Sequence, residues 1–171
     1  ILFRLVGSEM CIRDRHRSES YVSESRKPVV TFSTDLQEDL SRRDFTINSM
    51  AINLESGKLI DPHNGLRDLQ LKILRTPLDP DISFSEDPLR MLRAARFISR
   101  FNLTVAKGIK ESVNELRERL RIVSNERIRD ELNKLLTTPD PNPGFKFLLK
   151  TKLYETFLPE LKSCKRQHQI R

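Results

Sequence analysis

The side chains best suited to chemistry lie close together in the run EDPLRMLRAARF, residues 86–97. The proline in this run fits the first turn of a helix, where no intrahelical N–H is needed. At about 100° per residue, Arg90, Arg93 and Arg96 share one side of that helix, and apolar residues form the opposite side. Asp87 precedes Arg90 by one turn. The run therefore presents a carboxylate beside a guanidinium, with more positive charge further along the helix.

This carboxylate–guanidinium pair can discriminate between nucleotide bases. Asp offers only hydrogen-bond acceptors at neutral pH, and Arg offers only donors. The pairing edges of cytosine and adenine each place an amino donor beside a ring-nitrogen acceptor, so Asp87 can accept from the amino group while Arg90 donates to the ring nitrogen. Uracil and guanine place a carbonyl beside an N–H and meet the pair with the wrong polarity. A structural interpretation stays open here: Asp87 caps the helix, and the arginines form a solvated face.

The elements around this run predict an α+β chain. Up to residue 80 the pattern predicts short strands at 28–32, 45–54, 59–60 and 72–75 and short helices at 36–44 and 66–69. The turn at 55–58 predicts a β-hairpin between the second and third of these strands. After Pro80 the pattern is helical throughout, with one helix capped by Thr104 and another by Ser124. The helices would have to place the run at 86–97 against the strand-containing part.

The composition narrows the classes of partner. The chain has 171 residues, a net charge of +7 and a pI of about 9.7, which favours a polyanionic partner such as RNA. No long apolar run predicts a membrane span. Cys11 and Cys164 cannot build a disulfide framework or a cysteine-rich zinc site, so a reducing cytoplasm is the expected location. The three histidines are far apart and show no metal-ligand spacing.

The first fifteen residues differ from the rest of the chain. Residues 6–15 resemble translated sequencing-adapter sequence, and the apolar stretch before them is too short for a signal peptide. We therefore treat 1–15 as non-native sequence and leave it out of the predicted fold.

Three motifs, in this order, resemble those of one enzyme family. The first is RRDFTINSMA at 42–51, the second combines Asp61-Pro62 with Gly65-Leu66 and Leu74-Arg75, and the third is EDPLRMLR at 86–93. Together they resemble the class II, or bacterial-type, tRNA nucleotidyltransferases and the related bacterial poly(A) polymerases. The segment ERIRDEL at 126–132 resembles a further helical motif of this family.

The resemblance implies a domain organisation. Residues 16–80 would be the rear part of a nucleotidyltransferase α/β head, 81–140 a helical neck that holds the base-reading site, and 141–171 the start of a helical body. The Gly-rich strand-turn and the Asp-x-Asp pair that hold two Mg²⁺ ions in the family would precede residue 16. Glu9 and Asp14 do not have that pattern. We therefore expect an internal fragment with no catalytic or metal-binding residues of its own, inactive in isolation.

The resemblance also implies a function for the whole enzyme: template-independent addition of CCA to tRNA 3′ ends from CTP and ATP, with Mg²⁺. Its nucleotide-binding residues would correspond here to Arg43, Asp87, Arg90, Arg93 and Arg96, with Asp87 and Arg90 at the base edge. A bacterial poly(A) polymerase and a non-catalytic RNA-binding relative are the alternatives. For Asp44, Asp61 and Glu126 we expect structural roles: orienting arginines, ending a strand and supporting a helix start.

Overall fold

The computed structural model describes residues 2–3, 17–20, 29–32, 36–54 and 56–161 of the chain. Its helices are α1 (Leu36–Ser41), α2 (Gly65–Gln70), α3 (Pro80–Glu86), α4 (Leu89–Phe101), α5 (Ile109–Leu116), α6 (Asn125–Leu136) and α7 (Asn142–Lys150), with 3-10 turns η1 (Thr46–Asn48), η2 (Arg117–Ile122) and η3 (Leu153–Thr156). Its strands are β1 (Leu2–Phe3), β2 (Arg17–Ser20), β3 (Val29–Phe32), β4 (Ala51–Asn53), β5 (Leu59–Ile60), β6 (Ile73–Leu74) and β7 (Thr104–Val105). None of the helices in these ranges is long and apolar enough to span a bilayer. The predicted α+β class is confirmed.

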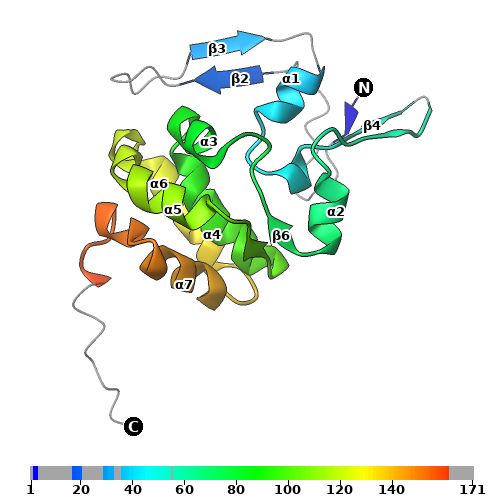
Figure 1. The fold of residues 1–171 in the computed structure, drawn as a ribbon. Helices are drawn as coiled ribbons and strands as arrows, with labels where there is room; N and C mark the ends of the chain where they lie inside the picture. The colour runs from blue at the N-terminus through cyan, green and yellow to red at the C-terminus, as the bar shows by residue number, and fades with distance from the viewer. Residues whose placement is uncertain (1, 4–16, 21–28, 33–35, 55, 162–171) are drawn as a thin grey trace.

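The strands form small sheets beside a group of helices (Figure 1). β4 and β5 pair antiparallel, which confirms the predicted hairpin, and β1 pairs with the other edge of β4. β1 belongs to the segment that the sequence analysis left out of the fold, whereas residues 4–16 lie outside the described ranges. β2 and β3 form a separate antiparallel pair. Helices α3 to α7 gather on the other side of the molecule from α2 and β4.

The strand predicted over 45–54 is wrong in its first half. Residues 46–48 form the 3-10 turn η1, and only β4 is extended. The Asn48 side chain accepts a hydrogen bond from the Phe45 N–H at 3.0 Å, and the Ser49 hydroxyl donates to the Phe45 carbonyl at 2.8 Å. Short polar side chains that bond the nearby backbone in this way compete with strand pairing.

The helix predicted to begin at Thr104 is also wrong. Thr104 lies in β7, which pairs in parallel with β6, and its N–H donates to the Lys72 carbonyl at 2.8 Å. Helix α5 begins at Ile109, directly after Gly108 with a φ of 90°. A left-handed backbone angle interrupts a helix and suits glycine. The pairing partner lies more than thirty residues earlier in the chain, beyond the reach of local pattern.

Helix α4 is the centre of the helical group and packs against both α6 and α7. Buried apolar side chains on these helices form the core: Met91, Leu92, Phe97, Leu135 and Phe147. The apolar side of α4 that the sequence predicts therefore faces α7 and the core. The arginine-bearing side is left to face the segment that precedes η1 and part of α6.

Gly144 brings α7 into close contact with α4. Its N–H donates to the Ser99 hydroxyl at 2.8 Å, and a Cβ at this position would lie 2.4 Å from the Ala95 carbonyl oxygen. We expect Gly144→Ala to lower the free energy of unfolding by about 1–3 kcal/mol, because the two backbones would have to separate. Urea unfolding measures the change, and Lys146→Ala on the exposed side of α7 is the control. Equal stability of the two variants would contradict this prediction.

Candidate nucleotide-binding site

Asp87 lies at the break between α3 and α4. Its backbone is extended, with φ of −137° and ψ of 96°, so the helix ends and restarts at this residue. One carboxylate oxygen, Oδ1, accepts a hydrogen bond from the Leu89 N–H at 3.1 Å. The capping interpretation of Asp87 is therefore correct for this oxygen. The other oxygen, Oδ2, lies 4.0 Å from Arg93 Nη1 and 3.8 Å from Arg127 Nη2.

Arg90 is a buried residue that joins three segments. Only 5% of it is exposed, so the interpretation of a solvated arginine face is wrong at this position. Nη1 donates to the carbonyl and hydroxyl oxygens of Ser83 at 3.1 and 3.0 Å and to Glu86 at 3.3 Å. Nη2 donates to the carbonyl of Arg42. Arg90 thus connects α4 to α3 and to the end of α1.

Two carboxylates from distant parts of the chain hold Arg93 and Arg96 of α4. Asp44 accepts a hydrogen bond from Arg93 at 2.9 Å and lies 3.6 Å from Arg90 Nε. We expected Asp44 to orient neighbouring arginines; the arginine that it bonds is instead 49 residues further along the chain, on α4. Glu131 on α6 accepts from Arg96 Nε at 2.7 Å and lies 3.7 Å from Arg93 Nε. The arginine side of α4 is therefore enclosed by acidic groups from both sides.

Arg43 is held elsewhere by α1. It forms an ion pair with Asp39 at 2.7 Å, and about a third of its side chain is exposed. The structure therefore brings together four of the five residues proposed from sequence, and it also brings in Asp44, Arg127 and Glu131. The last two are in the segment ERIRDEL, where their spacing of four residues places them on one face of a helix. That spacing could have shown that the two side chains lie on the same face of α6. It could not have shown that this face packs against α4.

Burial and neighbouring opposite charges shift the pKa values of these groups in opposite directions. Burial raises the pKa of Asp87 above its ordinary value, although Arg93 and Arg90 oppose this. Burial also works to raise the pKa of Glu131, but Arg96, Arg93 and Lys134 together outweigh it and hold that pKa below its usual range. Burial works to lower the pKa of Arg93, whereas Asp44, Asp87 and Glu131 together raise it. Arg93 therefore stays charged.

Two donor atoms in this cluster have no hydrogen-bond acceptor within the described part of the chain. They are the buried Nε atoms of Arg90 and Arg93. Each lies beyond 3.5 Å from the nearest carboxylate, Asp44 for Arg90 and Glu131 for Arg93. Buried polar groups are nearly always hydrogen-bonded, so an unbonded donor in a charged cluster calls for an explanation. Here each of the two Nε atoms is within ion-pair distance of a carboxylate, which compensates part of the lost hydrogen bond.

The carboxylates of the described ranges do not fit Mg²⁺. No group of three or more His, Cys, Asp and Glu side chains in those ranges could hold a metal ion. Asp44, Asp87 and Glu131 each lie within ion-pair distance of arginines. Asp79 and Asp81 have the Asp-x-Asp spacing, but Asp79 accepts a hydrogen bond from the Asp81 N–H and caps α3. We assign none of these residues to a metal.

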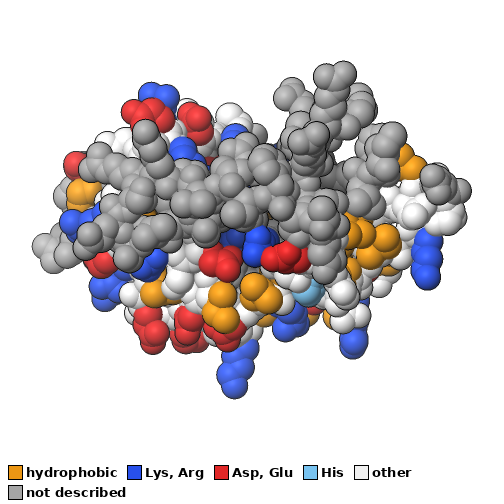
Figure 2. Space-filling model, turned by 90° about the horizontal axis from the view of Figure 1, so that it is seen from above, with side chains coloured by type: hydrophobic (Ala, Val, Ile, Leu, Met, Phe, Trp, Pro, Cys, Tyr) orange, Lys and Arg blue, Asp and Glu red, His pale blue; other side chains and the backbone are white. Residues whose placement is uncertain are grey.

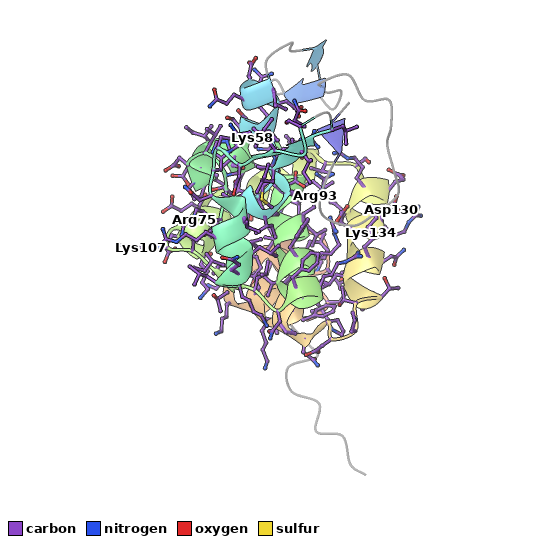
Figure 3. The ribbon with its side chains drawn as sticks, turned by 90° about the vertical axis from the view of Figure 1, so that its right-hand side faces the viewer. Lys58, Arg75, Arg93, Lys107, Asp130 and Lys134 are labelled. Atoms are coloured by element: carbon purple, nitrogen blue, oxygen red, sulfur yellow. The ribbon has the colours of Figure 1, made fainter. Side chains whose placement is uncertain are left out.

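Two further views show where charged side chains lie on the molecule. Figure 2 shows acidic and basic side chains next to one another near the middle of the face seen from above. In Figure 3, Arg93 lies near the middle of the molecule, while Asp130 and Lys134 project from α6 and Lys107 and Arg75 lie on the opposite side. The side chain of Arg93, on α4, is a quarter exposed and contacts Asp44 before η1 and Glu131 on α6.

Two family models match this chain. Residues 8–75 match the model described as the poly A polymerase head domain. Residues 102–165 match the model described as a probable RNA and SrmB-binding site of polymerase A. The site described above lies mainly between the two matched segments, on α3 and α4, with contributions from both.

Similar proteins are CCA-adding enzymes. The enzyme of Lactobacillus helveticus is 38% identical over 167 residues, which are 97% of this chain and 41% of the relative. That of Levilactobacillus brevis is 44% identical over 140 residues, or 81% of this chain and 35% of the relative. The chain thus spans about two fifths or less of the length of these relatives.

Solved structures give the same result. A Bacillus stearothermophilus CCA-adding enzyme in complex with CTP matches with a TM-score of 0.73 and 34% identity, covering 80% of this chain and 35% of that one. A Thermotoga maritima CCA-adding enzyme complexed with tRNA matches with a TM-score of 0.67 and 34% identity, covering 78% and 33%. A mixed α/β head followed by a helical neck is a nucleotidyltransferase arrangement. The chain belongs to the family of bacterial-type tRNA nucleotidyltransferases and poly(A) polymerases.

Proposed function

We propose that this chain is the nucleotide-selecting segment of an enzyme that adds CCA to tRNA 3′ ends from CTP and ATP without a nucleic-acid template. The observation that carries this proposal is the cluster around Asp87, where a carboxylate oxygen lies 4.0 Å from a guanidinium group of α4. Asp87 accepts the amino proton of cytosine or adenine, and an arginine donates to the ring nitrogen. The similarity to CCA-adding enzymes in complex with CTP and with tRNA supports the same substrates here.

Different arginines would contact different parts of a nucleoside triphosphate. Arg93 lies 4.0 Å from Asp87 Oδ2 and keeps a quarter of its side chain exposed, which suits a donor to the ring nitrogen of a base. Arg96 and Arg43 are further guanidinium groups that match phosphate oxygens in geometry and charge. Of these, Arg43 is the more exposed, and its ion pair with Asp39 is the contact that a triphosphate would replace. Within the complete enzyme, Mg²⁺ would be held by carboxylates other than those described above.

A poly(A) polymerase is the second candidate function. The family model that matches residues 8–75 is described as the poly A polymerase head domain. The two activities differ in product: a CCA-adding enzyme stops after three nucleotides and uses both CTP and ATP, whereas a poly(A) polymerase extends with ATP alone.

Product analysis tests the proposed function. A full-length enzyme containing this segment is incubated with Mg²⁺, tRNA lacking CCA and each labelled nucleotide, and the products are sequenced. We expect addition of two C residues and one A, and no incorporation by the isolated 171-residue chain, since its described carboxylates do not fit the metal ions that phosphoryl transfer requires. A tail of A residues alone would identify the poly(A) polymerase. A full-length enzyme that incorporates nothing would favour a non-catalytic RNA-binding protein.

A further inference from the structure

We propose that His63 is a positioning residue for Arg43: its ring holds the end of α1 in place, so that the Arg43 guanidinium can reach a bound triphosphate. The ring acts through Ser41 and has no contact of its own with the nucleotide. This inference rests on the proposed function, in which Arg43 binds phosphate oxygens. It gives the loop between β5 and α2 a part in nucleotide binding.

The hydrogen bonds of Ser41, the last residue of α1, define which ring nitrogen of His63 carries a proton. The Ser41 hydroxyl donates its single proton to the Gln37 carbonyl at 2.8 Å. Its oxygen lies 3.2 Å from His63 Nε2 and can only accept from that atom. Burial lowers the pKa of His63, although Asp61 opposes this, so the ring is neutral near pH 7. Its one N–H is therefore at Nε2 and donates to Ser41.

His63 lies on a loop that is itself anchored. Asp61 accepts hydrogen bonds from the Gly65 N–H at 2.7 Å and from the Leu66 N–H at 3.0 Å, which closes the loop onto the first turn of α2. A Cβ on Gly65 would lie 2.0 Å from the Thr46 carbonyl oxygen, so the start of α2 packs directly against the backbone of η1. The ring nitrogen that meets α1 is therefore attached to a fixed part of the chain.

Arg43 follows the end of α1 and lies among residues that are held from two sides. From the side of α4, Arg90 donates to the carbonyl of the preceding residue, and the carboxylate of the next residue, Asp44, accepts from a second arginine. From the side of α2, the loop holds Ser41. The Arg43 guanidinium lies 2.7 Å from Asp39, one turn earlier on α1. Displacement of the end of α1 would therefore move both the guanidinium and the carboxylate that orients it.

Loss of the donor should weaken triphosphate binding without altering base selection. Helix α1 has six residues, and a helix this short depends on tertiary contacts. We expect His63→Asn to raise KM for CTP and ATP by about threefold to tenfold, which corresponds to the loss of one hydrogen bond. Ser41→Ala, which removes the acceptor, should have the same effect. His63→Gln should restore KM, because the longer amide can place its N–H near the position of the ring Nε2.

A double-mutant cycle tests whether His63 acts through Arg43. Arg43→Gln alone should raise KM for CTP and ATP. Adding His63→Asn to Arg43→Gln should cause no further rise, because the group that His63 positions is then absent. If His63 supported the fold alone, its effect would be independent of Arg43 and the two changes would multiply.

The test measures kcat and KM for the four nucleotides in the full-length enzyme, with thermal unfolding of each variant. Gln70→Asn is the control, because it shortens an exposed polar side chain on α2. Three results overturn the inference: wild-type KM in a folded His63→Asn enzyme, no rescue by His63→Gln, or multiplied effects in the double mutant. If His63→Asn does not fold, Ser41→Ala takes its place in the cycle. A wild-type enzyme that does not prefer CTP and ATP overturns the proposed function instead.

Discussion

Asp87→Asn is expected to reverse the base preference of the full-length enzyme. Asn has nearly the shape of Asp, and its Oδ1 can still accept the Leu89 N–H. Its amide nitrogen then lies where the base-reading oxygen was, so a donor meets the amino group of cytosine or adenine. We expect kcat/KM for CTP and ATP to fall by about 10- to 100-fold, since a buried donor or acceptor left unpaired costs about 1–3 kcal/mol.

The same change supplies a donor for the carbonyl of uracil or guanine. Relative use of UTP and GTP should therefore rise, as measured by single-nucleotide incorporation with each of the four substrates. Glu118→Gln is a matched control, because it makes the same carboxylate-to-amide change on a side chain that is 58% exposed. If a folded Asp87→Asn enzyme still prefers C and A as strongly as wild type does, Asp87 does not read the base.

Asp87 and Glu131 are expected to have opposite effects on stability. Burial raises the pKa of Asp87, so the fold favours the neutral form, and Asp87→Asn should increase the free energy of unfolding near neutral pH. The pKa of Glu131 is lowered overall because the arginines and Lys134 outweigh burial. Glu131→Gln leaves Arg96 and Arg93 without this partner and should cost about 3 kcal/mol.

The pH dependence of the stability follows from the directions of the pKa shifts of Asp87 and Glu131. The folded chain holds the Asp87 proton more tightly than the unfolded chain does. The contribution of Asp87 to stability is therefore greatest below the unfolded pKa of 3.8 and is lost as the pH rises through the higher folded value. The contribution of Glu131 is fully present above the unfolded value of 4.5 and is lost as the pH falls through its lower folded value.

Urea unfolding of wild type and both variants at several pH values measures these effects. The difference in the free energy of unfolding between wild type and Glu131→Gln should shrink as the pH falls below 4.5. The difference in the free energy of unfolding between wild type and Asp87→Asn has the opposite sign and should shrink as the pH falls from the raised folded pKa of Asp87 towards 3.8. An Asp87→Asn chain that is less stable than wild type at neutral pH would show that the carboxylate serves the fold, as a helix cap does.

The sequence predicted helix α4 because the signals for a helix are local. A proline at the start, a three-residue arginine spacing and an apolar opposite side together specify a helix and its faces. The motifs also indicated the family, and the matches to family models and relatives confirm it. Local signals did not show which other segments of the chain would cover the arginine-bearing face of α4.

The remaining features depend on contacts between distant residues. Arg90 is buried because Ser83 and the Arg42 carbonyl close over it, and the second of these lies 48 residues away. Glu131 bonds Arg96, which lies 35 residues earlier in the chain. Residues 104–105 form a strand because they pair with β6. Periodicity places a side chain on a helix face, but it cannot tell which other segment will cover that face. The local turn η1 was missed for another reason: its apolar residues and threonine also suit a strand.

The burial of Arg90 limits how this site can diverge during evolution. Position 90 supports the junction of α3 and α4 through several hydrogen bonds, so a replacement there would disturb the chain path before it altered nucleotide choice. Asp87 accepts a backbone hydrogen bond from Leu89 and connects no third segment of the chain in this way. If Asp87 reads the base as we propose, descendants or engineered forms with new nucleotide preferences are expected to change first at position 87 and to retain the arginine at 90.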